Sequence, residues 1–133
     1  VAVMAAPMIP GINDAELERI LAAAAEAGAS SAGYVLLRLP HELRALFEEW
    51  LHRHYPDRAA RVLALVRQTR GGKLYDADFE RRQRGEGAYA EMLARRFEIA
   101  MRKCGLARRS EEMEKLSTAA FDGRAHDPQM RLL

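Results

Sequence analysis

The residues best placed for chemistry lie next to an apolar segment at the start of the chain. This segment, 1–8, is followed by a loop with two turn-forming residues, Pro10 and Gly11, before a helix begins at Asp14. A short apolar run without alternation is typical of a parallel-sheet strand buried on both faces. Sites in such sheets lie where strands end and helices begin. The loop 9–14 is therefore the first candidate site, and a plain strand-to-helix connector is the alternative.

A second candidate follows the next apolar segment. Residues 33–39 form another apolar run, which contains Arg38 near its end. Between the two runs, residues 14–27 carry apolar side chains at helical spacing, so we expect two parallel strands joined by a helix. Parallel strands end at the same edge, which places Arg38 beside the loop 9–14. An arginine there can clamp an anion or a carboxylate, and an ordinary salt bridge at the sheet rim is the alternative.

The rest of the chain is predicted to be mostly helical. Apolar side chains recur at helical spacing in four further segments, and the predicted helices are 41–54, 57–69, 88–105 and 110–120. Residues 121–133 are predicted to be a loose tail. His41 opens its helix at the candidate edge, so it can reach a substrate there. His52 and His54 lie two apart and do not share a helix face, so we predict no metal site.

An irregular basic segment, 70–87, lies between the predicted helices 57–69 and 88–105. Glycines at 71–72 and at 85 and 87 bracket residues 73–84, which contain two aromatic residues and three arginines, Arg81, Arg82 and Arg84. Basic residues interleaved with aromatics can bind a nucleic-acid backbone and stack on bases. Three acidic residues in the same segment dilute its positive field, so an irregular loop with solvated charges is the alternative.

The composition limits the function classes. A chain of 133 residues with 49% hydrophobic residues and a net charge of +2 is that of one ordinary globular domain. No apolar run approaches the roughly 20 residues of a membrane span, and no signal peptide is evident, so we expect a cytoplasmic protein. Cys104 is the only cysteine, which excludes a disulfide within the chain. Because Val1 already lies in a predicted strand, we expect the chain to be part of a longer protein.

The two candidate segments resemble a known enzyme family. Residues 8–14, then an alanine-rich helix, then residues 33–40 look like the fifth and sixth strand units of a radical S-adenosylmethionine enzyme. The fifth-strand signature there reads Gly-x-Ile-x-Gly-x-x-Glu. Ile9, Gly11 and Asp14 match it in register, with Asp in place of Glu, whereas Pro7 replaces the first Gly. The branch related to spore photoproduct lyase, often called DNA repair photolyase-like, is the most similar. Its likeness includes the Arg-Gly-Gly at 70–72 and the Arg-Gly-Glu-Gly at 84–87.

The resemblance implies an α/β fold: the C-terminal βα-βα portion of a partial (β/α)6 barrel, followed by additional helices. It covers residues 1–106, and residues 107–133 form a polar segment, partly helical or loose. The implied activity is a lyase-like cleavage of S-adenosylmethionine to a 5′-deoxyadenosyl radical, which would act on nucleic acid as in photolesion repair. The implied nucleoside contacts are Ile9, Pro10, Gly11, Asn13, Leu37 and Arg38. The residues expected to contact substrate are His41, Glu42, Arg81, Arg82 and Arg84.

The family's [4Fe–4S] cluster needs a Cys-x-x-x-Cys-x-x-Cys motif, and this chain has one cysteine. We therefore expect the cluster ligands in an upstream part of the same polypeptide, and we expect this chain alone to be inactive. Two other functions remain open, a nucleic-acid-binding module and a non-catalytic assembly domain. Exposed edges of a two-stranded sheet are expected to allow self-association.

Overall fold

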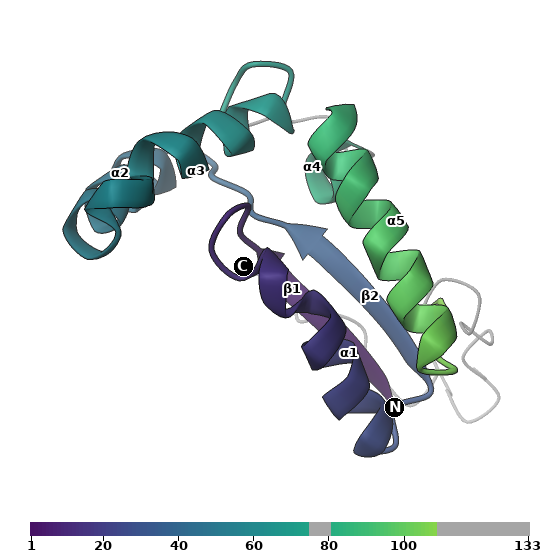
Figure 1. Cartoon of the computed structure of the whole chain (residues 1–133). Helices are drawn as coiled ribbons and strands as arrows, with labels where there is room; N and C mark the ends of the chain where they lie inside the picture. The colour runs from purple at the N-terminus through teal and green to yellow at the C-terminus, as the bar shows by residue number, and fades with distance from the viewer. Residues whose placement is uncertain (75–80, 109–133) are drawn as a thin grey trace, which may run out of the picture.

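The computed structural model describes residues 1–74 and 81–108, with the side chains of residues 81 and 82 excepted. The chain has a mixed α/β fold, in which strands and helices alternate at first and helices then follow (Figure 1). The elements are β1 (Ala2–Met8), the 3-10 helix η1 (Asp14–Glu16), α1 (Leu17–Glu26), β2 (Ser31–Leu36), α2 (Leu43–His54), α3 (Pro56–Gln68), α4 (Arg81–Arg84), α5 (Gly87–Lys103) and β3 (Ala107–Arg108). The helix predicted over 110–120 and the tail predicted over 121–133 lie outside the described residues.

The predicted parallel pair is confirmed. Strand β1 pairs with β2 in parallel, with Ala2 opposite Ser31 and Ala5 opposite Tyr34, and α1 connects the two strands. The register shifts between Ala5 and Met8, where Pro7 has no N–H to donate to the ladder. Beyond β2, the Leu37 N–H still donates to the Met8 carbonyl at 2.9 Å. The two strands therefore end side by side, as the sequence predicted.

The sheet has a third strand that the sequence did not predict. Strand β3 pairs in parallel with the start of β2, so the strand order is β1-β2-β3 and the expectation of two strands is wrong. The chain can return to the sheet because Gly105, with φ +66°, ends α5 in the left-handed conformation. Leu106 is then buried, and the Ala107 N–H donates to the Ser30 carbonyl at 3.0 Å. The strand is two residues long, too short for any alternation to show in the sequence.

One hydrophobic core joins the sheet to α1 and α5. Alternate residues of the strands, among them Ala5 and Tyr34, pack against Leu21 of α1 and Phe97 of α5. The other alternate residues of β1 are exposed, and Met4 keeps 40% of its surface. The expectation that this strand is buried on both faces is therefore wrong. Its small alanines gave an unbroken apolar run although only one face is packed.

A second core is formed by the helical pair α2 and α3. It contains Leu51, Val62 and Val66, all almost fully buried. Partly buried residues from the strand ends, Ile9 and Leu37 among them, pack against this core. Helix α3 thus lies beside the carboxyl edge of the sheet with α2 packed against it, while α1 and α5 lie along the strands (Figure 1). Within the described ranges, no helix is long and apolar enough to span a membrane.

Candidate functional site

The loop after β1 is held by its own polar side chains. The side-chain oxygen of Asn13 accepts the Ile9 N–H at 2.6 Å, and its amide nitrogen donates to the Pro7 carbonyl at 3.0 Å. Oδ1 of Asp14 accepts the Gly11 N–H at 2.9 Å. Each of these bonds lies within six residues of sequence, so the loop folds back on itself as an Asx-type turn. Asn13 and Asp14 therefore shape the loop before any ligand is considered.

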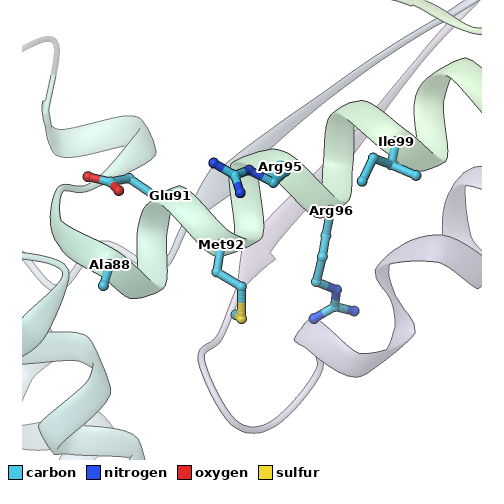
Figure 2. A pocket seen from close by; sticks show the side chains of 6 residues that line it. All are labelled: Ala88, Glu91, Met92, Arg95, Arg96 and Ile99. Carbon is cyan, nitrogen blue, oxygen red and sulfur yellow. The ribbon is translucent and has the colours of Figure 1, made fainter.

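Asp14 also anchors the loop to α5. The Tyr89 hydroxyl donates a short hydrogen bond to Oδ2 of Asp14, and Arg96 donates from Nη2 to the Asp14 carbonyl at 2.9 Å. Arg96 also makes a bidentate contact with Glu18, at 2.8 and 2.7 Å. Figure 2 shows Arg96 extending from α5 toward the start of α1. Sequence reasoning missed Tyr89 and Arg96, because they lie 75 and 82 residues from Asp14 and no local pattern links them.

These contacts shift the pKa values in the group. Burial, followed by the hydrogen bond to Asp14, raises the pKa of Tyr89 to about 12. The hydrogen bond from Arg96 lowers the pKa of Glu18, and the same bond raises the pKa of Arg96. The neutral phenol and the charged pair are thus the forms that the fold favours. These contacts hold the loop against α5 and the start of α1.

A cavity of about 300 Å³ lies beside this anchor, along α5. Met92 and Ile99 line it and keep about two fifths of their surface exposed, at 42% and 41%. In Figure 2, Met92 and Arg96 extend from the same side of the helix toward the loop after β1. Three of its lining residues, Ala88, Met92 and Ile99, are apolar, whereas Glu91, Arg95 and Arg96 are charged, and Arg96 is already paired with Glu18.

The far side of the loop is apolar and is covered by α3. Gly11 adopts φ +76°, and a Cβ added to it would lie 3.4 Å from Leu65 and 3.5 Å from Val62. Ile9 and Leu37 pack into the same core. On its Cβ side Gly11 thus faces two α3 side chains at ordinary van der Waals distance, and its expected contact with a nucleoside stays a prediction. A glycine is required here by the positive φ.

Two arginine side chains near the end of β2, Arg38 and Arg70, differ in their hydrogen bonding. Arg70, which follows α3, is 3% exposed, and its Nη2 donates to the Leu37 carbonyl at 2.9 Å. Arg38 is half-buried, and its Nε is buried without a hydrogen-bond partner. Within residues 1–74 and 81–108, Arg38 forms no hydrogen bond or ion pair, so the ordinary salt bridge considered as the alternative is not present. Buried polar groups are normally paired, so such an orphan indicates that a partner is missing.

The expected nucleoside residues thus share one edge but do not offer equal chemistry. The N–H groups of Ile9 and Gly11 are used by the loop, and both backbone groups of Leu37 are bonded. Pro10 is buried and has no N–H. Of the six residues expected to contact the nucleoside, Arg38 is the one with a buried side-chain donor that lacks a partner among the described contacts.

The residues expected to contact substrate lie farther out. His41 and Glu42 are both exposed just before α2, and His41 has a φ of +44°, which is uncommon for a residue with a side chain. The three arginines of the basic segment form the short helix α4. The guanidinium of Arg84 lies over the Tyr34 ring, 5.8 Å from its centroid. The side chains of Arg81 and Arg82, and the aromatic residues Tyr75 and Phe79, lie outside the described residues.

The chain does not fit an iron–sulfur cluster. Cys104 is half-buried at the end of α5, where it packs against the sheet core. Across the described part of the chain, no three residues of the metal-ligating types gather in one place. A cluster needs several thiolates at one site, and this sequence has a single thiol.

Comparisons with known proteins identify no relative of this chain. No family model, no curated protein and no solved structure matches the chain.

Proposed function

We propose that this chain forms one edge of a radical S-adenosylmethionine barrel, in which Arg38 holds the cofactor. In this proposal β1, α1 and β2 are the fifth and sixth units of the partial (β/α)6 barrel. The parent enzyme cleaves S-adenosylmethionine to a 5′-deoxyadenosyl radical, lyase-like, in the cytoplasm. The cluster and cofactor supply that chemistry, and no step of it falls to a residue of this chain.

The observation that carries the proposal is the buried Nε of Arg38, which has no hydrogen-bond partner among the described residues and lies at the carboxyl edge of two parallel strands. In sheets of this kind, ligands bind outside the carboxyl ends of the strands. Arginine presents a rigid fork of donors, which matches a carboxylate and also suits ring nitrogen or hydroxyl acceptors. Ile9 and Leu37 supply apolar surface beside it. The residues present thus suit a ligand with an anionic or polar end and an apolar ring.

Because the chain does not fit a cluster, the proposal requires cluster ligands from an upstream part of the same polypeptide. It also makes this chain alone inactive. Self-association is part of the same proposal, since β1 is an edge strand of the described sheet and Met4 on it is exposed. A concentration-dependent shift in size-exclusion volume tests that part.

Titration with three ligands tests the role of Arg38. S-adenosylmethionine carries both a carboxylate and a nucleoside, 5′-deoxyadenosine lacks the carboxylate, and methionine lacks the nucleoside. We expect S-adenosylmethionine to shift the backbone amide resonances of residues 37–39, and we expect Arg38→Gln to weaken binding about tenfold. Arg58→Gln is the matched control, because Arg58 is exposed on α3.

The three ligands also locate the contact. Loss of affinity for methionine but not for 5′-deoxyadenosine places Arg38 on the carboxylate, and the reverse places it on the nucleoside. If none of the three ligands shifts these resonances, or if Arg58→Gln weakens binding equally, the cofactor role of Arg38 is wrong.

Nucleic acid is the proposed substrate class. The observation in its favour is that Arg84 is exposed, with its guanidinium held over the buried Tyr34 ring, a position that suits contact with a phosphate backbone. Replacing Arg81, Arg82 and Arg84 together by Ala should reduce affinity for single-stranded DNA and flatten its dependence on salt. If the unmodified chain shows no salt-dependent binding, the segment has a structural role only.

A further inference from the structure

Helix α2 carries an apolar stripe on its exposed side. Leu43, Leu46 and Trp50 follow one another at spacings of three and four residues, so they lie on one face of the helix. All three are exposed, and Leu46 keeps 58% of its surface. A different face of α2, with Leu51, packs against α3, and Figure 1 shows α2 at the outer end of the fold. A contiguous exposed apolar surface of this kind is typical of an interaction site.

The α2 stripe, as we call these three residues, contains a side chain held in place by its neighbours. The ring of Trp50 stacks on Phe47 at 5.7 Å between centroids and also contacts Tyr55 at 5.4 Å. A tryptophan that is already ordered loses little side-chain entropy on binding, which suits an interface anchor. A hollow of about 170 Å³ lies beside it, lined by Leu46, Glu49, Trp50, Arg53 and His54. The stripe thus offers protruding leucines and also a hollow that can receive one.

Charged residues form one flank of the stripe. Glu42, Glu49 and Arg53 recur at spacings of seven and four residues, so they follow the same side of the helix beside Leu46. Arg53 contacts Glu49 at 3.3 Å, but both side chains are exposed, so this pair holds Arg53 only weakly. The flank is therefore acidic at the start of α2 and basic in its last turn.

We propose that the α2 stripe is an interface between two copies of this chain, with the two α2 helices antiparallel about a twofold axis. A twofold interface uses the same surface on both copies, so that surface must complement itself. In an antiparallel pair the two flanks lie on the same side, and the acidic start of each faces the basic end of the other. A parallel pair would leave the flanks on opposite sides, where they do not meet.

The spacing fixes which residues face each other. With the axis between residues 47 and 48, Glu42 lies opposite Arg53 of the second copy, and the symmetry forms this pair twice. Trp50 then lies opposite residue 45, between Leu43 and Leu46 of the second copy, and these leucines face the hollow beside Trp50. Glu49 lies nearer the axis, where Arg53 of its own chain offsets its charge. The surface thus complements itself in both shape and charge.

A second copy suits the stripe better than a membrane surface does, because anionic lipids would repel Glu42 and Glu49. Three exposed side chains make a small interface, so we expect a weak dimer, with a dissociation constant of about 0.1–1 mM. The α2 stripe is separate from the edge of β1, and the proposal does not depend on the radical S-adenosylmethionine assignment.

Sedimentation of the whole chain over a range of concentrations tests the proposal, together with tryptophan emission. Trp50 is the only tryptophan of the chain, so its emission reports on this surface alone. We expect the emission to shift to shorter wavelength as the dimer forms, because the ring loses contact with water. Association through the edge of β1 would leave the emission unchanged, which distinguishes the two contacts.

Single substitutions locate the interface. Leu46→Glu should weaken association at least tenfold, because it removes an apolar contact from each copy and adds a charge. It should leave the far-UV circular dichroism unchanged, since Leu46 is exposed. Met92→Glu is the matched control, because Met92 is a similarly exposed apolar residue on α5 and should leave association unchanged.

Charge exchange tests the antiparallel pairing. Glu42→Arg and Arg53→Glu should each weaken association at least threefold, because each variant places like charges opposite one another in its own dimer. An equimolar mixture of the two variants should regain most of the lost affinity, since both contacts between unlike chains then join an arginine to a glutamate. A loss of folding could not be reversed by mixing.

Three results would overturn the proposal. The chain could sediment as a monomer up to about 1 mM, well within the range where a dimer is expected. It could associate with no shift in the Trp50 emission, or Met92→Glu could weaken association as much as Leu46→Glu does. If the mixture of the two charge variants associates no better than either alone, the antiparallel arrangement is wrong.

Discussion

The loop after β1 and the end of β2 lie on the same edge of the sheet, yet their polar groups are in opposite states. In the loop, Asn13 and Asp14 are fully engaged with the backbone and with α5. At the end of β2, Arg38 keeps a buried Nε that has no hydrogen-bond partner within the described part of the chain. Because evolution rarely leaves buried donors unpaired, the first region is best explained as scaffold and the second as a contact surface.

The residues that the resemblance assigns to one nucleoside site therefore fall into two groups with different roles. The resemblance assigns the loop after β1 and the end of β2 to one nucleoside site. In the structure, however, the N–H groups of Ile9 and Gly11 are already hydrogen-bonded within the loop. Substitutions distinguish the two groups by their effect on the free energy of unfolding. Replacing a residue that holds the loop should lower this free energy, whereas replacing a residue that only contacts a ligand should not.

The largest effect is expected at Asp14. Asp14→Ala removes the acceptor for the Gly11 N–H and for the Tyr89 hydroxyl and leaves both donors unpaired. We expect the free energy of unfolding to fall by about 2–3 kcal/mol, measured by urea denaturation. Asp57→Ala, at an exposed position in the first turn of α3, should cost less than about 1 kcal/mol. If the two variants lose the same free energy of unfolding, the contacts of Asp14 do not hold the loop in place.

A smaller effect is expected at Gly11. Gly11→Ala should cost about 1–2 kcal/mol, because a residue with a Cβ is strained at φ +76°. Gly28→Ala is the matched control, since Gly28 has φ +88° and a Cβ there would have no heavy atom within 4 Å. The difference between the two denaturation midpoints isolates the contact with Leu65 and Val62. A larger loss at Gly28 than at Gly11 would mean that α3 does not constrain the loop.

The stability that Tyr89 contributes to the loop should depend on pH. Its folded-state pKa of about 12 lies above the ordinary value of 10.0, so its contribution is complete below pH 10 and is lost as the pH rises toward 12. Tyr89→Phe should cost about 1 kcal/mol at neutral pH. It should also flatten the fall in stability between pH 10 and pH 12, measured by urea denaturation at each pH. If the variant keeps the same alkaline slope, another group produces it.

Much of this arrangement was accessible from the sequence, and its limits have physical reasons. The parallel β1–α1–β2 unit followed from local apolar periodicity, which depends on residues close in sequence. Asn13 directly precedes a helix and could cap it, but its side chain instead turns back to Ile9 and Pro7 and makes no capping bond. Short polar side chains can satisfy either end of a turn, and the sequence does not decide between them.

Contacts between residues far apart in the sequence were the second feature that could not be predicted. Tyr89 and the strand β3 act on residues far away in sequence, and each signal is too short or too ordinary to be recognised alone. Arg38 was predicted at the correct edge because strand direction determines it. Its lack of a partner required the positions of all its neighbours.

The smallest change in stability is expected at Arg38, and it tests the comparison most directly. Arg38→Gln removes a buried donor that has no partner in residues 1–74 and 81–108, so the free energy of unfolding should change by no more than about 0.5 kcal/mol. Arg70→Gln is the matched variant at the same edge. Because Arg70 is 3% exposed and donates to the Leu37 carbonyl, its loss should cost about 2–3 kcal/mol.

A stability-neutral Arg38→Gln that also loses ligand affinity would show that this arginine is retained for binding, since folding gains nothing from it. If Arg38→Gln instead destabilises the chain as much as Arg70→Gln does, the guanidinium supports the fold, and the contact surface at the end of β2 has to be abandoned.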